Sequence, residues 1–112
     1  LEFRRVLFRS GGVRMNTLTM EEVKTLIQML LRKYNAEYAL LFGSYARGEA
    51  TAESDIDVVV VGGKNFKARD IFSFGEDLRQ MTNKDVDAFE IREVNKGTPF
   101  YESVMNEGVR IA

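Results

Sequence analysis

Hydrophobic residues recur three and four positions apart in two stretches of the chain, and this spacing predicts two amphipathic helices. Ahead of the first stretch, Thr19 and Glu22 form a capping box, a pattern that marks the start of a helix. This helix is expected to run for about four turns and to end near Asn35. The second helix covers Ile71 to Met81, although Gly75 within it costs about 1 kcal/mol relative to alanine.

A third helix is predicted near the end of the chain. Thr98 suits its N-cap, and Pro99 suits the first helical position because proline needs no hydrogen-bond donor there. Phe100 and Val104 are expected to face inward. Gly108 is the expected C-terminal stop.

Short apolar runs that lack helical spacing predict the strands. The first is Tyr38 to Phe42, and the second is Asp55 to Val61, which is rich in β-branched residues. Asp85 to Ile91 is a third candidate, and Val109 to Ala112 is a candidate edge strand. The order helix, strand, strand, helix, strand, helix predicts an α/β or α+β fold, in which helices pack on one face of a small mixed sheet.

The composition limits the possible chemistry. The chain has 112 residues, 45% of them hydrophobic and 29% charged, which suits one globular domain. It contains no cysteine and no histidine, so zinc–thiolate sites and histidine catalysis are excluded. Carboxylates, hydroxyls, lysines, arginines and the backbone remain. The longest apolar run, Val58 to Val61, is too short to cross a bilayer, so a soluble, cytoplasmic protein is expected.

The first 14 residues differ in charge from the rest. Four arginines stand there against one acid, Glu2, whereas the whole chain has a net charge of −1. A basic arm for nucleic acid is one interpretation. The preferred interpretation is that residues 1–14 are a disordered leader, a cloning remnant or read-through, and that residues 15–112 form the domain. Nucleic-acid and membrane partners are therefore not expected.

Asp55 and Asp57 form the most informative pair in the sequence. Residues two apart on a strand share a face, so both carboxylates point away from the core while Ile56 and Val58 point into it. Two neighbouring like charges repel each other, and a divalent cation relieves that repulsion. Magnesium takes carboxylates, phosphates and water as ligands, so the pair predicts a metal site. Taken alone, the same pattern is a common surface motif.

Gly43 and Ser44 offer the complementary half of such a site. A glycine directly after a strand lets the backbone approach a ligand closely, and backbone N–H groups and the Ser44 hydroxyl can donate to phosphate oxygens. If Ser44 to Arg47 begins a short helix, its N-terminus favours anions. Arg47 can then bind a phosphate or a carboxylate. Taken alone, Gly43-Ser44 could be an ordinary turn and Arg47 a solvated charge. Together with Asp55 and Asp57, they favour a nucleotide site.

The motif that runs from Leu41 through Gly43-Ser44 to Gly48, followed by Ser54 to Val60, resembles the signature of the polymerase-beta-like nucleotidyltransferases. The resemblance is to their minimal (MNT) branch. It implies a mixed sheet with flanking helices, two Mg²⁺ ions, and transfer of a nucleoside monophosphate, most simply AMP from ATP, to a hydroxyl. It also implies that the positions of Gly43 and Ser44 hold the triphosphate, and that those of Asp55 and Asp57 hold the metals.

The resemblance also implies a third carboxylate on a later strand. Asp87 is preferred, because the family's third acid follows an apolar residue and precedes a short apolar stretch. It would bind one metal and help to deprotonate the attacking hydroxyl. Asp85 and, less well, Glu90 are the alternatives. Four loop lysines could each contact phosphate but are interpreted as solvated charges: Lys64, Lys67, Lys84 and Lys96.

Several functions are compatible with this pattern. Similarity to MNT antitoxins implies AMP transfer to a tyrosine of a partner HEPN toxin. A small-molecule acceptor such as an aminoglycoside is a second possibility, and a homo-oligomer is an alternative to a toxin partner. A binding module without turnover, which holds a nucleotide or a partner, belongs to a different class. Clustered like charges argue against it, since an interaction surface gains nothing from them.

Overall fold

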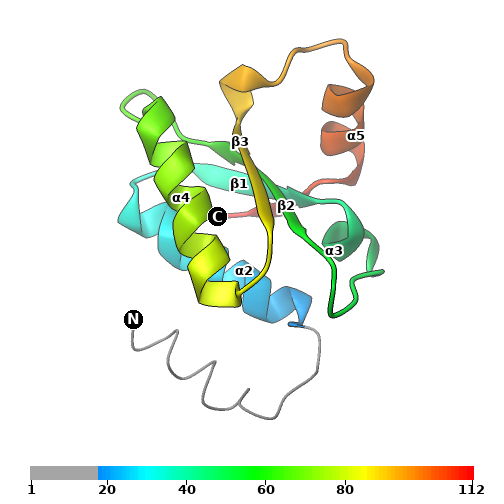
Figure 1. Ribbon diagram of the computed structural model, residues 1–112. Coiled ribbons are helices and arrows are strands. Elements are labelled where there is room, and N and C mark those ends of the chain that lie inside the picture. The colour runs from blue at the N-terminus through cyan, green and yellow to red at the C-terminus, as the bar shows by residue number, and fades with distance from the viewer. Residues whose placement is uncertain (1–17) are drawn as a thin grey trace.

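The computed structural model describes residues 18–112 (Figure 1). Four strands and the helices around them make up this part of the chain. In order they are α2 (Met20–Lys33), β1 (Tyr38–Phe42), α3 (Ser44–Arg47), β2 (Ile56–Val61), α4 (Ala68–Thr82), β3 (Val86–Glu90), the 3₁₀ turn η1 (Ile91–Glu93), α5 (Pro99–Glu107) and β4 (Val109–Ile111). The expectation for residues 1–14 lies outside the described residues.

The strands form one mixed sheet in the order β3-β2-β1-β4. β1 pairs antiparallel with both β2 and β4, whereas β2 and β3 run parallel. A parallel pair needs a crossover connection, which α4 supplies. The parallel register places the starts of β2 and β3 side by side at one end of the sheet.

Two helices, α2 and α4, pack on one face of the sheet, as the apolar spacing predicts (Figure 1). Every second residue of β2 points to this face, where Ile56, Val58 and Val60 are fully buried. They meet the buried stripes of α2 and α4, including Leu26 and Phe74. This layer is the main hydrophobic core, and it holds the sheet rigid beneath the other face.

The opposite face is partly covered as well, which the sequence did not indicate. A smaller cluster joins Phe42 and Val59 of the sheet to Val104 of α5. Val104 is 1% exposed, as predicted, but Phe100 is 39% exposed. Phe100 does face the sheet, because its ring packs edge-on against Phe42 and Phe89, but it lies at the border of the cluster and stays partly exposed.

The strand boundaries differ by one residue at the two positions that matter most for chemistry. Asp55 and Asp85 precede β2 and β3 instead of belonging to them. The two segments nevertheless pair here, because the amide of Ile56, which follows Asp55, donates to the Asp85 carbonyl at 3.0 Å. At the far end, Ile91 leaves the strand and begins the turn η1. Within residues 18–112, no helix is long and apolar enough to cross a membrane.

Replacement of Thr19 tests the predicted start of α2. The Glu22 amide donates to Thr19 Oγ1 at 3.1 Å, and the Thr19 amide donates to Glu22 Oε1 at 2.8 Å. Thr19→Ala is expected to lower the free energy of unfolding by about 1 kcal/mol in urea denaturation. Thr25→Ala, in the exposed middle of the same helix, is the control and should be neutral or slightly stabilising. Equal losses in both variants would contradict the capping role.

Candidate active site

The turn after β1 leads through a glycine with a positive φ directly into the short helix α3. Gly43 has φ 75° and ψ −151°, a conformation that side chains strongly disfavour, and it is the N-cap of α3. Its carbonyl accepts from the Arg47 amide at 3.1 Å, which closes the single turn of this helix. The predicted short helix from Ser44 to Arg47 is therefore confirmed.

Gly43 is also in close contact with Asp57. β1 and β2 are in register so that Phe42 lies opposite Asp57, which brings the following turn over the aspartate. A Cβ atom at Gly43 would collide with the Asp57 carboxylate oxygen Oδ2. Only glycine meets both conditions at this position, a positive φ and no side chain. The turn after β1 and the acidic strand β2 are thus joined through one glycine.

The second and third acidic positions of the sequence prediction meet across two strands. Asp57 on β2 lies directly opposite Asp87 on β3 in the parallel register. Asp57 is half-buried, whereas Asp55 and Asp87 are exposed. Burial and then the negative charges of Asp87 and Asp55 raise the pKa of Asp57 from its ordinary value of 3.8 to about 6. The three acids therefore form one electrostatic unit, although Asp55 precedes the strand and is not aligned by strand alternation.

These carboxylates fit a divalent cation that is shared with a substrate. The raised pKa of Asp57 shows that its negative charge is poorly compensated, and a cation would supply that compensation. Among residues 18–112, no three acidic, histidine or cysteine side chains are grouped as a self-sufficient metal site. A cation bound here would take further ligands from phosphate oxygens and water, which is how magnesium usually binds.

Arg47 lies near the acids, but its guanidinium is already engaged. Nε donates to Glu49 Oε1 at 2.9 Å, and Nη1 donates to Glu107 Oε1 at 3.3 Å. Its positive charge still acts on the site, since it opposes the rise in the pKa of Asp57. The side chain is exposed, so both ion pairs are weak. Binding a phosphate would require Arg47 to exchange at least one of them.

The two alternatives for the third acid have different surroundings. The exposed Asp85 lies before β3, and its carbonyl joins the sheet ladder. Glu90 is 5% exposed and lies at the other end of β3, opposite Val60. Its carboxylate accepts from the Arg92 backbone amide at 2.8 Å and from Arg92 Nε at 2.9 Å. Glu90 therefore closes the turn η1, and the structure does not bring it to the other acids.

Lys84 is the residue that the sequence interpretation missed. It was grouped with the solvated loop lysines, but its Nζ donates to the carbonyls of Ala52 and Ser54 at 2.9 Å each. It also lies 5.9 Å from the centroid of the Tyr45 ring. These contacts join segments about 30 residues apart, so no local pattern in the sequence indicates them.

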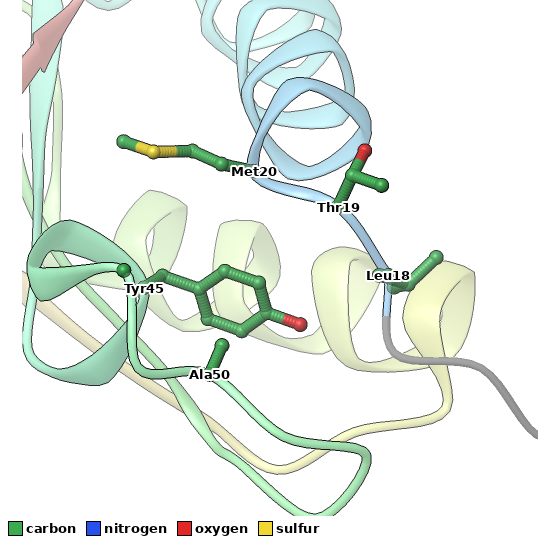
Figure 2. Close-up of a pocket in the computed structure, with 6 residues that line it drawn as sticks. Leu18, Thr19, Met20, Tyr45 and Ala50 are labelled. Carbon is green, nitrogen blue, oxygen red and sulfur yellow. The ribbon is translucent and has the colours of Figure 1, made fainter.

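An open pocket of about 270 Å³ lies between the start of α2 and the segment from Tyr45 to Ala50. Figure 2 shows the hydroxyl of Tyr45 pointing into it, between Leu18, Thr19 and Ala50. Tyr45 is 2% exposed, and its hydroxyl has no hydrogen-bond partner in the described part of the chain. None of the predicted site residues lines this pocket, although Tyr45 directly follows Ser44.

The fold, the glycine turn and the facing acids define a nucleotidyltransferase domain, and comparison with known proteins identifies its family. Residues 24–112 match the model of the family described as "Polymerase beta, Nucleotidyltransferase". This match covers most of the chain, and the chain therefore belongs to the polymerase beta nucleotidyltransferase family.

Two curated relatives come from Methanocaldococcus jannaschii. The first, "Putative protein adenylyltransferase MJ0435", is 29% identical over 94 residues, which cover 84% of this chain and 99% of the relative. The second, "Putative protein adenylyltransferase MJ1379", is 48% identical over 46 residues, which cover 38% of this chain and 46% of the relative. The longer alignment shows that the similarity extends well beyond the motif.

Solved structures, among them one described as a minimal nucleotidyltransferase, share the fold of this chain. One described as "toxin-antitoxin with AMP-PNP" has a TM-score of 0.68 at 25% identity and covers 80% of this chain and 72% of its own. A "putative minimal nucleotidyltransferase" has a TM-score of 0.68 at 24% identity, over 82% and 95% of the two chains. An MNT antitoxin complex with the tri-AMPylated HEPN toxin of Shewanella oneidensis has a TM-score of 0.65 at 22% identity, over 84% and 72%.

The contact between Gly43 and Asp57 can be measured with a double-mutant cycle. Gly43→Ala is expected to lower the free energy of unfolding by about 2 kcal/mol or more, because it combines an unfavourable φ with the collision. In an Asp57→Ala background the collision with the carboxylate is absent, so the same substitution should cost about 1 kcal/mol less. Urea denaturation of the four proteins gives the coupling. Additive losses would show that the two residues do not meet.

The repulsion among the acids predicts that Asp57→Asn stabilises the metal-free fold. The raised pKa means that the folded state binds a proton at pH values where the unfolded state does not, so the wild type gains stability as pH falls from about 7 to about 4. At pH 7.5 with EDTA, the free energy of unfolding of the asparagine variant should be about 1 kcal/mol higher than that of the wild type, a value that allows for solvent screening.

The pH dependence provides the control for this prediction. The advantage of Asp57→Asn should shrink as pH falls through 6, because the wild-type aspartate becomes neutral. Asp85→Asn, outside the strand and exposed, should change stability less at every pH. An Asp57→Asn variant that is less stable than the wild type at pH 7.5 would contradict the electrostatic account.

Proposed function

We propose that this chain is a Mg²⁺-dependent nucleotidyltransferase that transfers a nucleoside monophosphate, most simply AMP from ATP, to a hydroxyl group. The observation that carries the proposal is the junction of Gly43, Asp57 and Asp87. A glycine turn suited to phosphate lies against an aspartate that faces a second aspartate across the sheet. A fold selected for stability alone has little reason to gather these charges.

On the donor side, the turn binds the triphosphate. The backbone N–H groups after Gly43 and the hydroxyl of Ser44 donate to phosphate oxygens, and Arg47 releases a carboxylate to bind a further oxygen. Asp55 and Asp57 are the residues that would hold Mg²⁺ beside this turn. When bound, two such ions polarise the α-phosphate and stabilise the charge that develops on the leaving group.

On the acceptor side, Asp87 receives the incoming hydroxyl. The hydroxyl oxygen forms a bond to the α-phosphorus, the bond between that phosphorus and the β-phosphate oxygen breaks, and pyrophosphate leaves. The proton of the hydroxyl passes to Asp87, whose carboxylate is exposed and faces Asp57. Asp57 belongs to both halves of the site and fixes the distance between them.

We propose further that the acceptor is a tyrosine on a partner protein of the HEPN toxin class. Support comes from the fold neighbours, one of which is a complex that contains a tri-AMPylated HEPN toxin with its MNT antitoxin. The relatives named as protein adenylyltransferases point to the same acceptor class. The chain would then act as an antitoxin by modifying its partner.

A labelling experiment tests the proposal. The protein is incubated with α-³²P-ATP, MgCl₂ and a HEPN-type protein encoded beside it, and transferred label is followed on a gel. Label is expected on the partner, and EDTA should abolish it. Asp57→Asn and Asp87→Asn should each lower the rate by at least about 100-fold, because each removes a carboxylate from the reacting centre.

Asp85→Asn is the matched control, since it removes an equally exposed acid two positions from Asp87. It should keep a rate within about threefold of the wild type. Loss of label in Asp85→Asn but not in Asp87→Asn would exchange the roles of the two acids. If the wild type binds ATP but labels neither the partner nor itself, the chain is a binding module and the proposed activity is wrong.

A further inference from the structure

We propose that Lys84 is a positioning residue that holds the loop before β2, and thereby sets the place of Asp55 as a cation ligand. The inference rests on the proposed function, because it concerns the same acids. It goes beyond that function by assigning a role to a lysine whose ammonium group hydrogen-bonds to backbone carbonyls.

The contacts of Lys84 surround the approach to Asp55. Its Nζ donates to the carbonyls of Ala52 and Ser54, both at 2.9 Å, and Ser54 directly precedes Asp55. Hydrogen bonds from an ammonium group are stronger than those between neutral groups. Two of the three N–H donors of Lys84 therefore bind one short stretch of backbone, Ala52 to Ser54.

Without Lys84 this stretch has little to hold it in place. Thr51 to Glu53 is exposed, and its remaining hydrogen bonds are local: the Thr51 amide donates to Ser54 Oγ at 2.7 Å, and the Ser54 amide donates to the Thr51 carbonyl at 3.0 Å. Such bonds shape the turn but do not fix it to the rest of the domain. The sheet ladder begins only at Ile56. Asp55 thus lies between a fixed strand and a turn that Lys84 secures.

The lysine itself is held firmly. α4 ends at Thr82, and its C-cap Asn83 adopts the left-handed conformation with φ 57° and directs the chain toward β3. The Lys84 amide donates to Thr82 Oγ1 at 3.3 Å, and the side chain lies beside the ring of Tyr45. Burial lowers the pKa of Lys84, while the nearby charge of Asp55 acts in the opposite direction. The ammonium therefore gains from Asp55 as well as from the two carbonyls.

Lys84 connects the three segments that carry the predicted site. It begins the approach to β3 and Asp87, it contacts the loop before Asp55, and it lies beside Tyr45, which follows Ser44. Removing the ammonium should leave the core largely intact, because both of its hydrogen bonds are with carbonyls of the loop before β2. The position of Asp55, which the sheet does not fix, should change instead. Residues that orient metal ligands commonly change metal affinity by about 10- to 100-fold when replaced.

The test measures cation binding directly. Mn²⁺ in the presence of a non-hydrolysable ATP analogue is titrated against the protein, and binding is followed by water-proton relaxation. Lys84→Met is expected to weaken Mn²⁺ binding by about tenfold. Lys84→Arg, which can still donate to both carbonyls, should recover a large part of the loss. Lys64→Met removes an exposed loop lysine and should match the wild type.

This readout separates positioning from a loss of stability. A variant that only unfolds more easily would bind fewer Mn²⁺ ions per protein but with unchanged affinity. Unchanged affinity in Lys84→Met, in a wild type that binds Mn²⁺ with the analogue, would overturn the role of Lys84 alone. Absence of Mn²⁺ binding in the wild type would overturn the proposed function, and the inference with it.

Discussion

The close approach of the Gly43 backbone to the Asp57 carboxylate is the constraint on which the rest of the site depends. The turn after β1 can lie over β2 only because Gly43 lacks a side chain, and it can continue into α3 only because glycine tolerates the positive φ. The antiparallel register of β1 and β2 delivers the two residues to the same point. The glycine turn and an acid are thereby brought together by the fold itself.

Repulsion among Asp55, Asp57 and Asp87 lowers the stability of the fold when no cation is bound. Asp57 is half-buried next to Asp87 and near Asp55, and its pKa rises to about 6 because the folded protein stabilises its charge poorly. The rigid layer of α2 and α4 beneath the sheet tolerates this repulsion, since Ile56 and Val58 on either side of Asp57 are fully buried. Natural proteins commonly accept such local destabilisation where a cation or a substrate relieves it.

Much of this arrangement could be predicted from the sequence, and the remainder could not for identifiable reasons. The capping box at Thr19, the strand from Tyr38 to Phe42 and the turn at Gly43 are local features, and they are present where the pattern indicates. Three results depend on distant segments: the register that pairs Asp57 with Asp87, the exposure of Phe100, and the contacts of Lys84. Periodicity along one chain carries no information about which segments meet.

The crossover from β2 through α4 to β3 divides the site into two structural blocks. A single β–α–β unit carries all three candidate acids, whereas the glycine turn belongs to β1 and α3. The register between β2 and β3 is set by their own hydrogen bonds, so α4 can change in sequence on its outer side without moving the acids apart. A chain that keeps the glycine turn while losing Asp87, which does not pair with β1, would therefore retain the shape of the site without one of its acids.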